Sequence, residues 1–429
     1  MRLMAGKYWW KEAKIYELYI DKFAGTIQNL TAQLDYFTKL GINTLHILPH
    51  YPSPMIDDGY DVMDYCSVRP ELGTLEDFEN LVKAAHARGI RIIVDFVLNH
   101  VSDQHPWFLE ARSSKKNPRR DYFLWHENDR RFTESWNAFQ GIKESNWIYN
   151  EATNDFYYAT FYPAQPDLNW DNPDVVSGMM AYMDFWADHG VDGFRLDAVL
   201  TLIKRDGTIS KGLPETHAII RKIRAHLDTK YGGNIILLAE SHMEVEEIKT
   251  FFGNGDECHM AYHFPLMEAL YLHLLLDEPA RVEEVLEKSK DIPANCTWAT
   301  FLRNHDEISL ATLPLIRRTT LVSQLDPEGE YLFNRGQATA VRLANIFDGK
   351  PEKLREAITL LYSLPGSPIM YYGDEIMMRN LPREEGVADT RRFVRGPFDW
   401  EEAAREDANP DSLLAFVRKT IHTSRALHR

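Results

Sequence analysis

Three carboxylates in this sequence each close a segment that begins with a short apolar run. Asp197 closes GFRLD, Glu240 closes IILLAE, and Asp306 closes FLRNHD. Short apolar runs of this kind are typical of buried parallel strands, and in a (β/α)8 barrel the C-terminal ends of such strands converge on one face. Three acids on that face could supply the nucleophile and the proton donor that cleavage of a glycosidic bond requires.

The neighbours of these acids suggest different roles for them. Arg195 lies two residues before Asp197, so in a strand both side chains share a face, and the cation would favour the ionised form of a nucleophile. Glu240 follows three apolar residues, a setting that suits an acid holding its proton near neutral pH. His100, which closes the segment DFVLNH, could donate a hydrogen bond to a sugar hydroxyl, although a lone histidine at a strand end is more often structural.

Eight strand-like segments alternate with longer amphipathic ones along the chain. This alternation implies a parallel sheet, and eight repeats imply closure into a (β/α)8 barrel. Leu75–Arg88 and Asp174–His189 show helical spacing, and Thr74 with Asp77 forms a capping pattern before the first of them. The predicted strands are Lys14–Tyr19, Thr44–Leu48, Arg91–Val97, Gly193–Leu196, Ile235–Ala239, His259–Tyr262, Thr297–Leu302 and Ser367–Tyr371.

Residues 100–170 break this rhythm. The stretch is rich in aromatic residues, Asn, Asp and Pro and has no clear strand–helix unit, which in a compact domain usually marks a functional insertion. We therefore expect a barrel built from residues 1–99 and 171–429, with a subdomain inserted at 100–170 after the third strand. A second insertion is expected at about 312–334.

Composition narrows the classes of function. The chain of 429 residues carries a net charge of −16, which disfavours nucleic acids and anionic membranes as partners and is neutral toward an uncharged sugar. Its three cysteines are widely spaced and form no zinc or CxxC pattern, and the first ten residues lack the apolar core of a secretory signal. No stretch is long and apolar enough to span a membrane. A cytoplasmic enzyme is the resulting expectation.

The motifs together resemble glycoside hydrolase family 13, the α-amylase family. Four stretches occur in the family's order, and a fifth, Gln165–Asn169, is similar to that of the branch containing oligo-1,6-glucosidases, sucrose isomerases and trehalose synthases. The likeness covers nearly the whole chain. Its first four stretches are Asp95–His100, Gly193–Ala198, Glu240 with its preceding run, and Asn304-His305-Asp306.

The resemblance implies a role for each matching residue. Asp197 would be the nucleophile that forms a covalent glucosyl–enzyme intermediate, and Glu240 the general acid/base. Asp306 would bind hydroxyls of the distorted sugar. Sugar-binding or orienting roles would fall to His100, Arg195 and His305.

The same resemblance implies a pocket that is closed at one end. Tyr60 would stack on the glucose unit, and Asp57 would close the pocket with a late arginine, which we assign to Arg395 rather than to Arg391 or Arg392. Such closure favours small α-glucosides and exo-action. The enzyme would then be an α-glucosidase or a transglycosylase that is similar to trehalose synthases, with an endo-acting α-amylase as the alternative.

Some features depart from the family pattern. The segment after the first strand, Asp21–Thr26, lacks the oxygen ligands that calcium needs, so we expect no metal there and no cofactor. Asn99 would match a calcium ligand of α-amylases but is more often structural in this branch. The late arginine segment differs from the trehalose synthase pattern, and the usual C-terminal β-sandwich is not seen after Asp411–Arg429, which is expected to be helical. Two remoter readings are a non-catalytic sugar-binding relative and a barrel that uses its acids to bind metal; the oligomeric state stays open.

Overall fold

A computed structural model describes residues 8–139 and 142–424, and its centre is a closed barrel of eight parallel strands. All eight predicted strands are present, each within about one residue of its expected bounds. Around the barrel the order is β1-β14-β10-β9-β8-β7-β3-β2. The strands are β1 (Ile15–Leu18), β2 (Thr44–Ile47), β3 (Arg91–Val97), β7 (Gly193–Asp197), β8 (Ile236–Ala239), β9 (Met260–Tyr262), β10 (Thr297–Phe301) and β14 (Ser367–Tyr371).

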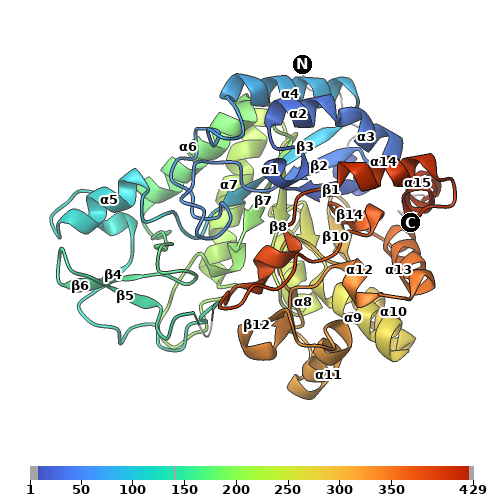
Figure 1. Cartoon of the computed structure of the whole chain (residues 1–429). Coiled ribbons are helices and arrows are strands. Elements are labelled where there is room, and N and C mark those ends of the chain that lie inside the picture. The colour runs from blue at the N-terminus through green and yellow to red at the C-terminus, as the bar shows by residue number, and fades with distance from the viewer. Residues whose placement is uncertain (1–7, 140–141, 425–429) are drawn as a thin grey trace.

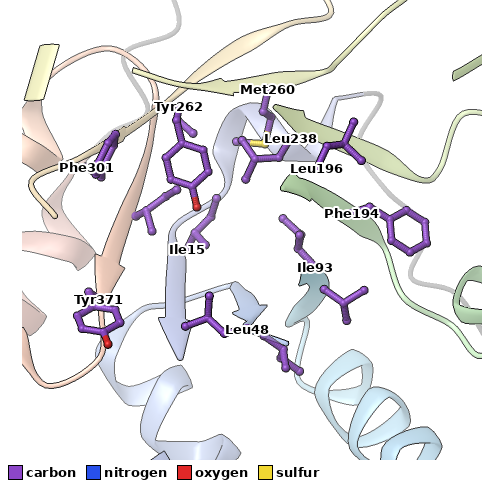
Figure 2. Packing of buried hydrophobic residues seen from close by; sticks show 14 of the residues in the cluster. Ile15, Leu48, Ile93, Phe194, Leu196, Leu238, Met260, Tyr262, Phe301 and Tyr371 are labelled. Atoms are coloured by element: carbon purple, nitrogen blue, oxygen red, sulfur yellow. The ribbon is translucent and has the colours of Figure 1, made fainter. Parts of the chain in front are cut away.

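Every residue of these strands is buried, because the barrel interior covers one face and helices cover the other. Figure 2 shows Leu196, Leu238 and Met260 of neighbouring strands close together in this core. Gly193 opens β7 where a Cβ would lie 2.4 Å from the Ile236 side chain of β8, so the two strands pair closely only because this position is glycine.

Helices between the strands form the outer layer (Figure 1). The predicted capping pattern before α4 (Leu75–Ala87) is a complete capping box, in which Thr74 and Asp77 bond each other's backbone N–H groups. The other helices outside the two insertions are α1 (Ile20–Phe23), α2 (Ile27–Ala32), α3 (Leu34–Leu40), α6 (Pro173–Asp188), α7 (Pro214–Tyr231), α8 (Val245–Lys249), α9 (Phe264–Leu276), α10 (Pro279–Lys288), α12 (Leu343–Ile346), α13 (Pro351–Ser363), α14 (Trp400–Ala408) and α15 (Leu413–Thr423).

Between β3 and α6 the chain leaves the barrel and builds a small antiparallel sheet, seen beside the barrel in Figure 1. The strands β4 (Trp125–His126), β5 (Trp147–Asn150) and β6 (Asp155–Tyr158) pair in the order β4-β6-β5, and α5 (Pro106–Ser113) precedes them. The returning chain bridges the end of β3, since His100 pairs with Asp167.

A second excursion follows β10. It contains α11 (Leu315–Leu325) and a sheet of β11 (Ile308–Ser309), β13 (Ala338–Thr339) and β12 (Leu332–Phe333). Phe333 of this segment contacts Phe139 of the first excursion, with ring centroids 5.9 Å apart. The two excursions therefore meet through a small apolar cluster separate from the barrel core.

The last described helix, α15, covers part of the expected helical stretch, and residues 425–429 of that stretch lie outside the described residues. Among the residues described, no helix combines the length and apolar character that crossing a membrane requires.

Candidate active site

The three strand-end carboxylates line one pocket at the C-terminal mouth of the barrel. Asp197 is the last residue of β7, Glu240 directly follows β8, and Asp306 lies five residues beyond the end of β10. Because β7, β8, β9 and β10 are consecutive in the barrel, their ends bring these acids to one side of the opening. Tyr60, His100 and Asp57 line the same pocket, while Arg195, His305 and Arg395 lie behind its wall.

One guanidinium faces both carboxylates of the predicted catalytic pair. Arg195 Nη1 donates to Asp197 Oδ1 at 2.6 Å, and its Nη2 lies 2.8 Å from Glu240 Oε1. The side chain is fully buried, as the shared face of Arg195 and Asp197 on β7 predicts. One buried cation therefore holds the two acids close together.

Behind Arg195, a buried chain of charged and polar groups crosses the barrel. Asp95 of β3 accepts from Arg195 Nη1 at 2.8 Å and from the Tyr60 hydroxyl at 3.0 Å. His46 of β2 lies between Asp95 and Glu17 of β1, at 3.2 and 3.1 Å. These contacts fix the arginine that in turn orients the two acids.

Burial and the carboxylates Glu240, Asp95 and Asp306 raise the pKa of Asp197, and Arg195 opposes this shift only in part. The expected lowering by Arg195 is present as a contribution, but burial outweighs it.

The backbone after β7 is strained and helps to place Glu240. Ala198 adopts a left-handed conformation with φ of 47°, which is uncommon for a residue with a side chain. Its N–H then points at Glu240 and donates to Oε2 at 2.9 Å. The turn thereby holds the second acid beside the first.

His305 links the third acid to the barrel interior. Its Nδ1 lies 2.9 Å from Glu17 Oε1, and its Nε2 lies 3.0 Å from Asp306 Oδ2 and 2.6 Å from the Tyr60 hydroxyl. Burial alone would lower the pKa of His305, but Asp306 and Glu17 raise it to about 9. A charged imidazole at neutral pH, helped by Arg391 and Arg395, keeps the pKa of Asp306 well below its usual value despite burial.

The partner of Asp57 is Arg391, so the predicted pairing with Arg395 is wrong. Arg391 Nη2 donates to Asp57 Oδ1 at 2.8 Å, whereas Arg395 donates to Asp58 at 2.6 Å and to Asp306 at 2.9 Å. The short helix η7 (Thr390–Val394) separates the two arginines by about one turn, which sends them to adjacent acids. Burial raises the pKa of Asp57 to about 6, although Arg391 works against this.

The Gln165–Asn169 stretch and His100 make further contacts beside the pocket. Gln165 donates to Asp57 Oδ2 at 3.0 Å, so the inserted stretch helps to hold this acid at the pocket. His100 Nε2 lies 3.2 Å from the Tyr60 carbonyl, and burial lowers the pKa of His100 to about 4, leaving it neutral. Its Nδ1 lies 3.3 Å from Asn99 Nδ2, so both ring nitrogens of His100 have polar partners within the protein.

A buried lysine that the sequence did not single out holds the insertion to the barrel. Lys204 Nζ lies 2.7 Å from Asn99 Oδ1 and 2.6 Å from Asp167 Oδ2, and it also donates to the Thr201 carbonyl. Its ammonium thus occupies the oxygen-lined space between the end of β3 and the returning chain. Across residues 8–139 and 142–424, no group of three or more His, Cys, Asp or Glu side chains could hold a metal ion.

The rest of the pocket lining is partly aromatic and partly polar, and most of it was not predicted. The aromatic members come from the insertion and from the start of α9, where sequence pattern gives no signal beyond aromatic richness. Two polar members, His242 and Glu307, lie within two residues of a predicted acid. The unpredicted lining residues include Trp136, Phe139, Phe161, Phe264, Lys211, His242, Asn304, Glu307, Ser309, Asn334 and Arg391.

Residues 10–323 match the family model of the α-amylase catalytic domain. The chain therefore belongs to the α-amylase family of glycoside hydrolases, as the motifs and the barrel site indicated.

Within this family the chain is similar to several trehalose synthases. It is 40% identical to the trehalose synthase/amylase of Mycolicibacterium smegmatis, over 96% of this chain and 69% of that protein. It is 39% identical to the trehalose synthase of Thermus thermophilus, again over 96% of this chain. The chain spans only 42% of the length of the Thermus protein. An oligo-1,6-glucosidase of Parageobacillus thermoglucosidasius is 30% identical, over 89% of this chain and 68% of that protein.

Solved structures share the same fold. The trehalulose synthase of Pseudomonas mesoacidophila MX-45 superposes with a TM-score of 0.77 at 27% identity, over 97% of this chain and 84% of that one. The isomaltulose synthase of Klebsiella sp. LX3 gives a TM-score of 0.77 at 26% identity, over 96% and 84%. An inactive variant of the first enzyme was crystallised with isomaltulose.

Proposed function

We propose that this chain cleaves small α-glucosides with retention of configuration, through a covalent bond between glucose and Asp197. The observation that carries the proposal is the single buried guanidinium of Arg195, which faces both Asp197 and Glu240 at the mouth of the barrel. Retaining enzymes need a nucleophile and an acid/base placed together in this way.

In the first step, Glu240 would protonate the glycosidic oxygen while Asp197 Oδ attacks the anomeric carbon. The glycosidic bond breaks, the leaving group departs as an alcohol, and glucose stays on Asp197 as an ester. In the second step, Glu240 takes a proton from an incoming hydroxyl, which attacks the same carbon and releases Asp197. Asp306, kept ionised by His305, would bind hydroxyls of the distorted sugar ring.

The identity of the incoming hydroxyl decides the outcome. Water gives hydrolysis, and a sugar hydroxyl gives transfer or isomerisation. Similarity to trehalose synthases, to an oligo-1,6-glucosidase, to a trehalulose synthase and to an isomaltulose synthase supports a glucosyl unit in both cases. The Asp57–Arg391 pair, which would close one end of the pocket, supports a small substrate over the interior of a starch chain.

The chain is also proposed to act in the cytoplasm. The support is chemical: Cys66, Cys258 and Cys296 are all free thiols, and burial raises the pKa of each. Thiols that stay reduced are typical of a reducing compartment.

The test is to incubate the protein with maltose, isomaltose, sucrose and trehalose in turn and to identify the products by NMR. Glucose alone would mean hydrolysis, and new disaccharides would mean transfer. Asp197→Asn should abolish turnover by at least about 10⁴-fold, because the ester cannot form. Its circular dichroism spectrum and Tm should match those of the parent; activity retained by a folded Asp197→Asn variant would overturn the proposal.

A further inference from the structure

His242 lies across the barrel from the wall that closes the pocket. Asp57 follows β2 and Arg391 follows β14, the two strands that flank β1. His242 follows β8, which is opposite β1 in the eight-strand ring, and it lines the same pocket two residues after Glu240. If the glucosyl unit fills the end closed by Asp57 and Arg391, His242 faces the part of the pocket beyond the bond being cleaved.

Contacts from two other segments hold the His242 ring in one orientation. The ring stacks on Phe264 at the start of α9, with centroids 4.2 Å apart and planes within 9°. Its Nε2 lies 2.9 Å from Glu268 Oε1. Glu268 is buried on α9 and also accepts hydrogen bonds from the backbone N–H and the hydroxyl of Thr312.

This anchoring fixes which ring nitrogen is available. A carboxylate only accepts hydrogen bonds, so Nε2 must carry the proton that it donates to Glu268. Nδ1 then presents a lone pair, and it bonds to no side chain or backbone group within residues 8–139 and 142–424. The half-buried ring thus offers one unused acceptor at the pocket wall.

We infer that His242 is a specificity-determining residue that binds a hydroxyl of the acceptor sugar, with Glu268 as its positioning residue. This inference rests on the proposed function. By holding the sugar beside the glucosyl–Asp197 ester, Nδ1 favours its hydroxyl over water as the attacking group. The bonds made and broken are those of the second step already described, so His242 neither gains nor loses a proton overall.

The experiment compares His242→Phe with the parent, using p-nitrophenyl α-glucoside as donor and glucose as acceptor. Phenylalanine keeps the ring against Phe264 but removes both nitrogens. The readouts are p-nitrophenol release without glucose, and the ratio of new disaccharide to hydrolysed glucose when isotope-labelled glucose is added. We expect the ratio to fall about tenfold, the effect of one lost hydrogen bond, while p-nitrophenol release changes less than about threefold.

His226→Gln is the matched control, because His226 also pairs with a carboxylate, Asp184, at 2.9 Å, but on the helices outside the barrel. It should leave both readouts unchanged. A second variant, Glu268→Gln, keeps the side-chain volume but removes the carboxylate that fixes the proton on His242 Nε2. It should raise the glucose concentration that gives half-maximal transfer by a larger factor than it changes hydrolysis. It keeps the test decisive if His242→Phe does not fold.

An unchanged ratio in a folded His242→Phe variant would overturn the inference, and so would a parallel fall of both readouts, which is the mark of a merely structural role. A parent that forms the glucosyl ester but transfers nothing to glucose would also overturn it, yet leave the proposed function standing. Absence of any glucosyl ester on Asp197 by mass spectrometry, with no turnover of any donor, would instead defeat the proposed function itself.

Discussion

At the scale of single residues, two arginines that are only four positions apart pair with different acids beside the pocket. Arg391 contacts Asp57 and Arg395 contacts Asp58, and both also reach Asp306 Oδ1, at 3.2 and 2.9 Å. Arg391→Ala should raise the KM for maltose at least about tenfold, because a buried carboxylate loses its partner and the wall opens. Arg392→Ala is the control, since this exposed neighbour pairs with Glu384 at the surface, at 3.7 Å. Steady-state kinetics of both variants check this, and equal effects would contradict it.

His305 makes a second residue-scale prediction, on stability. Its pKa is raised to about 9 in the folded protein, against about 6.5 when unfolded. Because the folded protein binds this proton more tightly than the unfolded chain, protonated His305 stabilises the fold. The stabilisation is complete below pH 6.5 and is lost as the pH rises toward 9. The loss amounts to about 3 kcal/mol. Urea unfolding from pH 6 to 9.5 should show it, and His305→Gln should flatten the profile. If the stability of the variant fell with pH as steeply as that of the parent, groups other than His305 would account for the loss.

Sequence pattern alone could predict a site residue where its type followed a strand, whereas Asp57 and Tyr60 were assigned through the family resemblance. Asp197, Glu240 and Asp306 follow apolar runs whose ends the barrel gathers, so their approach follows from topology. Arg391 was missed because its segment has no regular pattern, and a shift of four residues changes nothing visible in the sequence. Lys204 was missed because its partners, Asn99 and Asp167, lie far away in the chain.

At the scale of elements, the helix caps carry measurable stability. Thr74 and Asp77 form the capping box of α4, on the outside of the barrel and away from the pocket. Thr74→Ala should lower the free energy of unfolding by about 1 kcal/mol and leave kinetics unchanged. Thr229→Ala, at an exposed position within α7, should change it by less than about 0.5 kcal/mol. Chemical denaturation of the two variants makes the comparison; a similar small loss in both would show that the cap contributes little.

The length and burial of the strands explain why the barrel could be predicted from the sequence and the two small sheets could not. Barrel strands are buried on both faces and therefore read as continuous apolar runs. The strands β4, β11, β12 and β13 have two residues each, too few for any period to register. Aromatic richness marked the first insertion as unusual, but it did not reveal how its strands pair.

At the scale of the whole molecule, Lys204 ties the first excursion to the barrel. Its ammonium lies between Asn99 and Asp167, both fully buried. Lys204→Met should destabilise the protein by about 3–5 kcal/mol, since Asp167 would be left as a buried charge without its cation. Lys230→Met, which removes a surface lysine that pairs with Asp184, should cost less than about 1 kcal/mol. Thermal melts of the two variants and of the parent measure the difference. The Tm of the parent should not change when EDTA is added, because the Lys204 ammonium and not a dissociable metal ion lies between Asn99 and Asp167. If Lys204→Met had the same Tm as Lys230→Met, Lys204 would not stabilise the contact between the first excursion and the barrel.

In the proposed function, the closed end at Asp57 and Arg391 also sets the quantity to which the enzyme would respond. A pocket of this form admits the terminus of a glucan and not its middle. Each polymer molecule offers few termini however heavy it is, so the effective concentration of substrate is a number of ends and not a mass of carbohydrate. An equal mass of disaccharide therefore offers the enzyme far more chain ends than starch does. Any other activity that shortens glucan chains raises the number of ends without adding sugar.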